Sequence, residues 1–545
     1  MAAPERTHRG SGPERGEGPD VLAAALAGAD DDAPAFTMLR WRGDEAVDAT
    51  WSRRALLDAA RDAAGSITAQ TDPGDRVVIA APPGLDFIAA FLGCLGAGRI
   101  AVPAPFPGAA RARAFVERIA AVTGARLVAT EALAAAPVDL RPAAPDAIAY
   151  LQFTSGSTQA PRGAAITHGA LSANLRAIGA TWDLGPDDRG VFWLPPFHDM
   201  GLVGAILTPL AFGFPATLMH PAAFLQKPHR WLARIAQERA TFSGAPNFAY
   251  DLCVDRTTPA QRAALDLSSW RVAVNGAEPV LALTLRRFAG AFAGAGFRAD
   301  AFAPGYGLAE TVLFATARRR GSGPAMSPEG AVSCGAPAPG THLRIVDEAR
   351  GVALAEGETG AVWIAGPSLA RGYWNDPAAT ADVFDHRLPG EPHAFLRTGD
   401  IGRLRAGDLF VCGRAKDVIV RGGRNLHAAD LEQAIALRLG RDRRTAAFAA
   451  PGPAGDRLVI VQEARAGDDL DASRAAIVDA LGADCDAQAD AIVFTAPGGV
   501  PVTTSGKVAR AAARDAWRTG ALPAPPHPTS ETAHDFAVDV PAHAR

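Results

Sequence analysis

Lysine is scarce in this sequence, and clustered cysteines and any excess of positive charge are missing from it. The 545 residues carry 54 basic and 58 acidic side chains, for a formal net charge of −4, so no surface for a polyanion such as nucleic acid is predicted. The five cysteines lie far apart, and no CxxC or HExxH pattern occurs, which argues against a disulfide framework and a zinc site. These absences favour a protein of the reducing cytoplasm.

The sequence also lacks a targeting signal and a clear membrane-spanning run. Residues 1–20 contain Glu, Arg, Gly and Pro where a secretory signal would need an apolar segment, so a disordered tail is expected there. Residues 200–226 carry no charge and are long enough to span a bilayer. Prolines and glycines divide them into a helix-length piece, a turn and a short strand at Ala216–Met219, which predicts soluble core and no membrane span.

Three residue types are rare enough for their positions to be informative. Only three of the 54 basic residues are lysines, Lys227, Lys416 and Lys507. A chain that uses arginine almost everywhere else is expected to keep lysine where a compact ammonium on a flexible stem is needed. Asparagine (positions 174, 247, 275, 375 and 425) and tyrosine (positions 150, 250, 306 and 373) are similarly sparse.

Length and apolar patterning predict an α/β protein with a large multi-layer N-terminal domain and a smaller α+β C-terminal domain. Strand-like runs alternate with alanine-rich helical runs, as at residues 76–80 and Leu85–Gly96. The small domain is expected to open with a hairpin of residues 409–412 and 418–421, followed by a helix from about Ala429. The expected boundaries are a disordered tail at 1–20, the large domain at 21–415, the small mobile domain at 416–520 and a second disordered tail at 521–545.

Three segments share one design, an apolar strand followed by a polar or glycine-rich loop and then a helix. The strands are predicted at residues 148–153, 272–274 and 299–303, and the loops at residues 154–163, 275–279 and 304–310. Ligands of parallel α/β sheets bind at the carboxyl ends of the strands. The three loops are therefore expected to converge on one crevice.

The first loop, TSGSTQAPRG, has the composition of a phosphate cradle. Hydroxyls and glycine N–H groups can surround phosphate oxygens, while Arg162 supplies positive charge. An ordinary Ser/Gly turn explains this loop equally well when it is taken alone. A Walker A loop is excluded, because the residues around the Gly506–Lys507 pair do not fit that pattern. The cradle residues would be Thr154, Ser155, Gly156, Ser157 and Thr158.

The other two loops add groups suited to a purine nucleotide. The ring of Tyr306 and the carboxylate of Glu310 suit a base and a magnesium ion that also binds phosphate oxygens. Asp400 can accept hydrogen bonds from two ribose hydroxyls. Taken singly, the same three residues also fit a core aromatic, a helix-start residue and a turn residue.

Eight ordered segments resemble the motifs of the adenylate-forming enzymes, which include acyl-CoA synthetases, firefly luciferase and the adenylation domains of peptide synthetases. The resemblance is greatest to the fatty acyl-AMP ligases, through HDMGL (198–202), APNFAY (245–250) and the GRN ending (423–425). The segments are LQFTSGST, WLPPFHDMGLVG, FSGAPNFAYDLC, WRVAVNGAEPV, YGLAE, FLRTGD, GRAKDVIVRGGRN and TTSGKVAR.

The resemblance implies ATP and Mg²⁺ as cofactors and gives each motif a role. Residues 154–158 would bind the pyrophosphate end of ATP near Arg162, and Glu310 would hold the magnesium ion. Lys507 would be the catalytic lysine of the small domain and Lys416 would lie at the hinge, whereas Lys227 fits a surface position. Adenine and ribose would contact Gly276, Ala277, Glu278, Tyr306, Gly307, Asp400 and Arg414.

His198 and Asp199 have several interpretations. Such a pair can be a general base or a metal ligand, or can cap a turn, and the resemblance suggests a gate between an acyl tunnel and the nucleotide. The apolar residues that follow, together with residues 242–250, would line the acyl pocket or would simply pack in the core. The apolar residues are Leu202, Val203, Ile206, Leu207 and Leu210.

The resemblance implies an ATP-dependent ligase that activates a medium- or long-chain fatty acid as acyl-adenylate and passes it to an acyl carrier protein. No carrier-type GxDSL segment follows Arg510, so the carrier is expected to be a separate chain. An acyl-CoA synthetase stays open as an alternative, because the segment between Glu310 and Cys334 is shorter than the usual insertion of fatty acyl-AMP ligases. The other alternative is a degenerate nucleotide-binding regulator, against which the intact motif residues argue.

Overall fold

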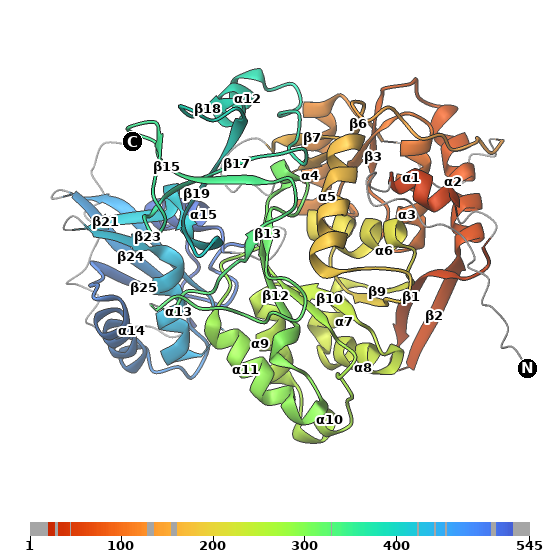
Figure 1. Cartoon of the computed structure of the whole chain (residues 1–545). Helices are drawn as coiled ribbons and strands as arrows, with labels where there is room; N and C mark the ends of the chain where they lie inside the picture. Colours follow the sequence, from red (N-terminus) through yellow and green to blue (C-terminus); the bar gives the residue numbers. More distant parts are fainter. Residues whose placement is uncertain are drawn as a thin grey trace, which may run out of the picture.

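The computed structural model describes residues 20–27, 31–43, 45–127, 136–153, 161–328, 330–421, 424–440, 443–452, 455–502 and 508–526. Most of the two predicted tails, and the loop residues 154–160 and 503–507, lie outside these ranges. Within the described residues, helices and strands mix along the whole chain, as the α/β prediction requires (Figure 1).

The largest sheet carries the strands that precede the second and third predicted loops. Six of its strands, β12, β11, β10, β8, β9 and β1, run parallel to one another. Strand β2 pairs antiparallel at one edge, and β13 and β14 pair antiparallel at the other. In order of pairing the strands are β14 (Ala336–Pro337), β13 (Thr316–Ala317), β12 (Phe302–Tyr306), β11 (Val272–Asn275), β10 (Phe242–Ala245), β8 (Gly190–Phe192), β9 (Ala216–Met219), β1 (Pro34–Arg42) and β2 (Glu45–Ser52).

A second sheet carries the strand before the first predicted loop. Its strands pair in the order β5 (Arg126–Leu127), β3 (Arg76–Ile79), β4 (Ile100–Pro103), β6 (Ile148–Phe153) and β7 (Gly163–Thr167). Strand β7 follows the first loop and pairs antiparallel with β6. The prediction of a helix directly after this loop was therefore wrong, because the loop joins two neighbouring strands.

A third sheet places Asp400 within a long strand. The sheet runs β16 (Val352–Ala353), β15 (His342–Asp347), β17 (Gly360–Ala365), β19 (Ala394–Arg405) and β18 (His386–Arg387), and β20 (Asp408–Arg414) also pairs with β19. The predicted hairpin of residues 409–412 with 418–421 was wrong, because β20 pairs antiparallel with the preceding strand β19. This pairing puts Asp400 opposite Arg414.

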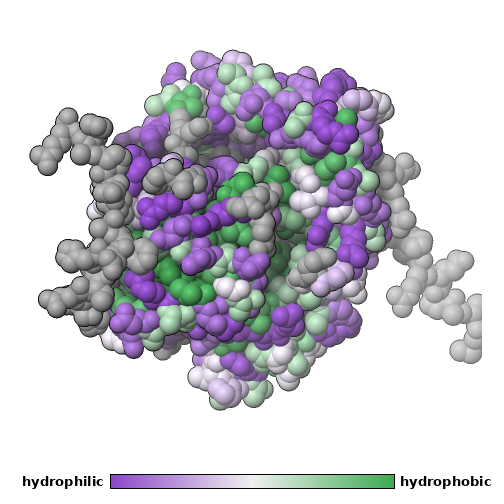
Figure 2. All heavy atoms as spheres, turned by 90° about the vertical axis from the view of Figure 1, so that its left-hand side faces the viewer, coloured by the Kyte–Doolittle hydropathy of each residue, from purple (hydrophilic) through white to green (hydrophobic). Residues whose placement is uncertain are grey.

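The C-terminal elements have a core of their own and lie together on the left of Figure 1. Their strands are β21 (Val418–Arg421) paired with β22 (Arg424–His427), and β23 (Thr445–Gly452), β24 (Gly455–Glu463) and β25 (Ala491–Thr495) in one sheet. Arg510 donates to Glu432 at 2.7 Å and to Asp417 at 2.8 Å, which ties three of these segments together. The face on this side is hollowed in its middle, where hydrophobic side chains gather (Figure 2).

Two predicted elements differ in the third loop region. Residues 299–301 form a 3-10 turn, so the strand begins only at Phe302, and the loop is followed by a 3-10 turn in place of a longer helix. The helical elements are α1 (Val21–Ala27), α2 (Arg53–Thr68), α3 (Leu85–Gly96), α4 (Ala110–Thr123), α5 (His168–Trp182), η1 (Met200–Leu207), α6 (Thr208–Phe212), α7 (Pro221–Gln226), α8 (His229–Glu238), α9 (Asn247–Arg256), α10 (Pro259–Ala263), α11 (Ala282–Phe292), η2 (Ala293–Ala295), η3 (Ala299–Ala301), η4 (Ala309–Thr311), α12 (Pro377–Val383), η5 (Ala415–Asp417), α13 (Ala428–Leu439), α14 (Leu470–Cys485) and α15 (Arg510–Arg518).

Asn174 of α5 fixes the turn that carries Glu310. Its buried side-chain amide donates to the carbonyl oxygens of Thr311 at 3.0 Å and Phe314 at 2.7 Å. Its Oδ1 accepts from the backbone N–H of Phe314 at 3.3 Å. One side chain therefore makes three hydrogen bonds to a segment about 140 residues away along the chain.

Replacing Asn174 by alanine is expected to lower the free energy of unfolding by about 2 to 4 kcal/mol, because three buried backbone groups lose their partner. Chemical denaturation measures this loss. Arg286→Ala, at an exposed position of α11, is the control and should change stability by less than about 0.5 kcal/mol. Equal stability of both variants would contradict the assigned role of Asn174.

Candidate active site

The Glu310 turn follows β12 through a glycine that tolerates no side chain. A Cβ atom added at Gly307 would lie 1.7 Å from the carbonyl oxygen of Leu313, so the two ends of the turn pack backbone to backbone. Val312 closes the turn at a φ of +68°, which a β-branched residue rarely adopts. Such strain is typical of sites where the surrounding structure holds the backbone in place.

The carboxylate of Glu310 is partly buried and held by a tyrosine. Tyr373 Oη donates to Glu310 Oε1 at 2.6 Å, and the backbone N–H of Ala370 donates to the Glu310 carbonyl at 2.8 Å. Burial raises the pKa of Glu310, and the hydrogen bond from Tyr373 opposes this effect. A nearby cation would favour the ionised form of this carboxylate and so lower its pKa.

Tyr373 connects Glu310 to the end of the predicted phosphate loop. The guanidinium carbon of Arg162 lies 5.6 Å from the Tyr373 ring centroid, and Arg162 Nε lies 3.5 Å from an oxygen of Asp376. Arg162 is therefore beside the Glu310 cluster, as the convergence of loops predicts. The cradle itself, residues 154–158, lies outside the described residues.

Asp400 forms a second cluster with Tyr306 and Arg414. Tyr306 Oη donates to Asp400 Oδ2 at 2.7 Å, and Arg414 Nε donates to Oδ1 at 3.1 Å. The negative charge of Asp400 raises the pKa of Arg414, and the charge of Glu310 adds to this rise. The interpretation of Asp400 as a turn residue is thus wrong: it is a buried residue of β19 whose partner comes from the adjacent strand β20.

The second loop is held in a strained form next to β12. Ala277 has a φ of +68°, and a Cβ at Gly276 would lie 3.0 Å from the carbonyl oxygen of Gly305. Asn247 fixes the loop: its Nδ2 donates to the carbonyl of Pro279 at 2.8 Å, and its Oδ1 accepts from the N–H of Leu281 at 3.1 Å.

Within this loop, Glu278 is half-buried. Sequence reasoning assigned the Asn247 region to an acyl pocket and missed its role in the loop. Only the rarity of asparagine pointed to it.

His198 and Asp199 cap the helix η1. His198 Nδ1 lies 2.7 Å from Asp199 Oδ1, and the backbone N–H of Met200 donates to that same oxygen at 2.6 Å. Gln152 of β6 donates from Nε2 to the carbonyl of Phe197 at 3.0 Å. The capping interpretation holds for Asp199. Its negative charge also helps to raise the pKa of Glu310 and of the buried Tyr150.

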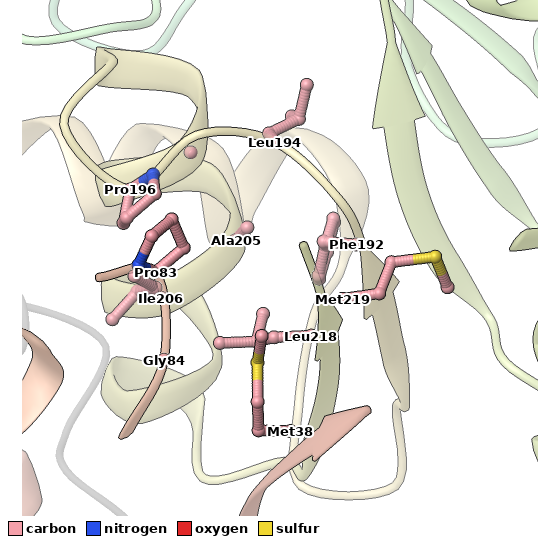
Figure 3. A pocket seen from close by; sticks show the side chains of 11 residues that line it. Met38, Pro83, Gly84, Phe192, Leu194, Pro196, Ala205, Ile206, Leu218 and Met219 are labelled. Carbon is pink, nitrogen blue, oxygen red and sulfur yellow. The ribbon is translucent and has the colours of Figure 1, made fainter. Parts of the chain in front are cut away.

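An apolar pocket lies beside η1 (Figure 3). No charged side chain lines it. Of the five apolar residues predicted to line a pocket, only Ile206 does so, and none of residues 242–250 takes part. The lining residues are Met38, Pro83, Gly84, Phe192, Leu194, Pro196, Gly201, Ala205, Ile206, Leu218 and Met219.

Two of the three lysines lie in the part of the chain that the structure describes. Lys507 lies outside the described residues, and Lys416 is exposed in η5, between β20 and β21. Lys227 is exposed at the end of α7. Among the described residues, no helix is both long and apolar enough to cross a membrane, and no group of three or more His, Cys, Asp or Glu could hold a metal ion.

Known proteins match this chain along most of its length. The AMP-binding enzyme family matches residues 25–134 and 107–374. The chain is 35% identical over 534 residues to the medium-chain-fatty-acid–acyl-carrier-protein ligase JamA of Moorena producens, covering 86% of this chain and 90% of that protein. It is also 35% identical over 568 residues to FadD21 of Mycobacterium tuberculosis, named a putative fatty-acid–CoA ligase, covering 91% and 97%.

A solved structure extends the likeness to the fold. The fatty acyl-adenylate ligase of L. pneumophila, in complex with acyl adenylate and pyrophosphate, is 31% identical, with a TM-score of 0.70 over 93% of this chain and 96% of that chain. The family match covers residues 25–374, and the likeness to the solved structure extends over 93% of this chain. The chain therefore belongs to the AMP-binding enzymes, and within that adenylate-forming superfamily to the fatty acyl-AMP ligases.

Proposed function

We propose that this enzyme activates a medium- or long-chain fatty acid with ATP, forms an acyl-adenylate and pyrophosphate, and transfers the acyl group to the phosphopantetheine thiol of a separate acyl carrier protein. One observation carries the proposal. An apolar pocket without charged lining lies beside the His198–Asp199 segment, since Pro196 and Gly201 line it, and the charge of Asp199 also acts on the carboxylate of Glu310. An acyl chain and a polyphosphate can thus approach each other at this segment.

The nucleotide would bind across the two tyrosine-held clusters. Asp400 would accept hydrogen bonds from the ribose hydroxyls, and Arg414, its partner at 3.1 Å, would keep the carboxylate in place. Gly276, Ala277 and Glu278 would flank the adenine, with Tyr306 and Gly307 on the facing strand end. Residues 154–158 and Arg162 would hold the phosphates.

The donor set fits a magnesium ion that arrives with ATP. Magnesium is usually bound by one or two carboxylates together with phosphate oxygens, and Glu310 is a carboxylate beside the end of the phosphate loop. A cation there would also stabilise the ionised form of a carboxylate whose pKa burial raises. The ion would neutralise charge on the phosphate oxygens.

Catalysis would rest on positioning and electrostatics. The fatty-acid carboxylate attacks the α-phosphorus, the bond to the pyrophosphate breaks, and negative charge moves onto the leaving group. Arg162 and Lys507 would stabilise that charge, and His198 would orient the attacking carboxylate at the mouth of the pocket. No covalent enzyme intermediate is needed.

The acceptor of the acyl group separates this proposal from its alternatives. JamA is named for an acyl carrier protein and FadD21 for coenzyme A, so both thiols must be compared. We favour the carrier because of the HDMGL, APNFAY and GRN motifs. A regulator without catalysis is disfavoured, since Glu310, Asp400 and Arg414 are present and mutually arranged.

ATP–pyrophosphate exchange across a series of acids is the test of the proposed function. Each methylene buried in an apolar pocket contributes about 0.8 kcal/mol, so activity should rise about fourfold per methylene until the pocket is filled. Acetate and amino acids should be poor substrates, because no charged group lines the pocket. Equal activity with acetate and dodecanoate would overturn the substrate class.

Glu310→Gln should reduce exchange by roughly 2 to 4 kcal/mol of transition-state stabilisation while leaving the fold intact, since the amide oxygen can still accept from Tyr373. The magnesium concentration needed for half-maximal activity should also rise. Glu117→Gln, at an exposed position of α4, is the matched control. Near-normal exchange by Glu310→Gln would remove Glu310 from the catalytic set.

Lys507→Ala should abolish acyl-adenylate formation from ATP, yet still transfer the acyl group when purified acyl-adenylate and holo-carrier are supplied. The reason is that a lysine of a mobile domain reaches the α-phosphate in only one domain orientation. Lys507→Arg should also be poor, because a planar guanidinium replaces a compact ammonium. The control is Lys227→Ala, which should keep both half-reactions; equal loss of both by Lys507→Ala would make this lysine structural.

A further inference from the structure

The helix that borders the pocket is wound as a π-helix. Its hydrogen bonds run over five residues: both the backbone N–H and the side-chain hydroxyl of Thr208 donate to the carbonyl of Val203, the hydroxyl at 2.8 Å. Asp199 caps its beginning. π-helical turns are rare and occur often at functional sites.

This winding decides which side chains face the pocket. With hydrogen bonds over five residues, the positions four and five after Gly201 lie on the same face as Gly201, and these are Ala205 and Ile206. Leu202, Val203 and Leu207 do not line the pocket, although Ala205 and Ile206 are buried in the same hydrophobic cluster as these three residues. The structure thus places Gly201 and Ala205, two of the smallest residues of the helix, at the pocket beside Ile206.

Neighbouring positions of the helix differ sharply in their surroundings. A Cβ at Gly201 would lie 1.9 Å from the carbonyl oxygen of Pro195, so the helix start is packed directly on the His198 segment. A Cβ at Gly204 would lie 3.6 Å from Leu313, an ordinary contact on another side of the helix. Ala205 faces the pocket about one helical turn further along than Gly201 (Figure 3).

The wall facing Ala205 is made of residues that can adapt. Met38 of β1 and Leu218 of β9 line the pocket together with Phe192 of β8, whereas the side chain of Met219 points to the other face of β9 and packs in a different core cluster. Methionine side chains are flexible and fill irregular apolar space. The helix side is packed against the core through its other faces and cannot retreat, so a larger residue at position 205 must occupy the pocket itself.

We propose that Ala205, presented by the π-helical winding of η1, sets the length of the acyl chain that the pocket accepts. The inference rests on the proposed fatty-acid activation and goes beyond it by assigning chain-length selection to one residue. The carboxylate end of the acyl chain would lie at the His198 segment near Gly201, and the methylenes would pass Ala205 toward Ile206.

The test compares Ala205→Leu and Ala205→Val with Gly204→Ala in ATP–pyrophosphate exchange on acids of four to sixteen carbons. Ala205→Leu should shift the optimum to shorter acids and lower kcat/KM for dodecanoate by about 10- to 100-fold relative to butanoate, since overpacking a fitted cavity is strongly unfavourable. Ala205→Val should shift it less. Gly204→Ala should keep the wild-type profile.

A binding measurement supplies a readout independent of catalysis. Calorimetric titration with non-hydrolysable acyl-adenylate analogues of four and twelve carbons should show weaker binding of the long analogue by Ala205→Leu, with the short analogue nearly unchanged. A wild-type length profile in both Ala205 variants, with thermal stability retained, would overturn this inference. Absence of exchange with every acid in the wild-type enzyme would instead overturn the proposed function.

Discussion

Two carboxylates, each held by a tyrosine hydroxyl, organise the crevice of this enzyme. Glu310 accepts a hydrogen bond from Tyr373 at 2.6 Å, and Asp400 accepts one from Tyr306 at 2.7 Å. Both carboxylates raise the pKa of Arg414. A carboxylate withdrawn from water needs such partners, because an unpaired one would be costly to ionise. The loops, strands and turns around the crevice keep these contacts in register.

Keeping the contacts in register costs local strain, which the rest of the fold offsets. Val312 and Ala277 adopt positive φ angles beside the two functional loops. Two asparagines hold these loops from behind: Asn174 bonds the Glu310 turn three times, and Asn247 bonds the loop that follows β11. Tyr250 adds a hydrogen bond to the carbonyl of Val274 at 2.8 Å. Asn174, Asn247 and Tyr250, which belong to residue types that are rare in this sequence, thus hold the strained loops in place.

The acyl side of the site depends on the shape of an uncharged pocket and not on paired charges. The same uncharged stretch that could be mistaken for a membrane span supplies η1 and β9, two short elements that line one pocket. The π-helical winding of η1 brings Gly201, Ala205 and Ile206 to the pocket, while Leu202, Val203 and Leu207 do not line it.

The sequence by itself determined the α/β class, strand β6 and helix α3 to the residue, the absence of disulfides among its scattered cysteines, and the family through its ordered motifs. These follow from local propensity, apolar period and motif spacing, which need no knowledge of distant partners. Tertiary structure alone decided that β20 turns back to place Arg414 on Asp400 and that Tyr373 reaches Glu310 across 63 residues. Which apolar residues line the pocket was also decided at that level, because strand pairing and helix winding are set by the packing of the whole domain, not by the residues themselves.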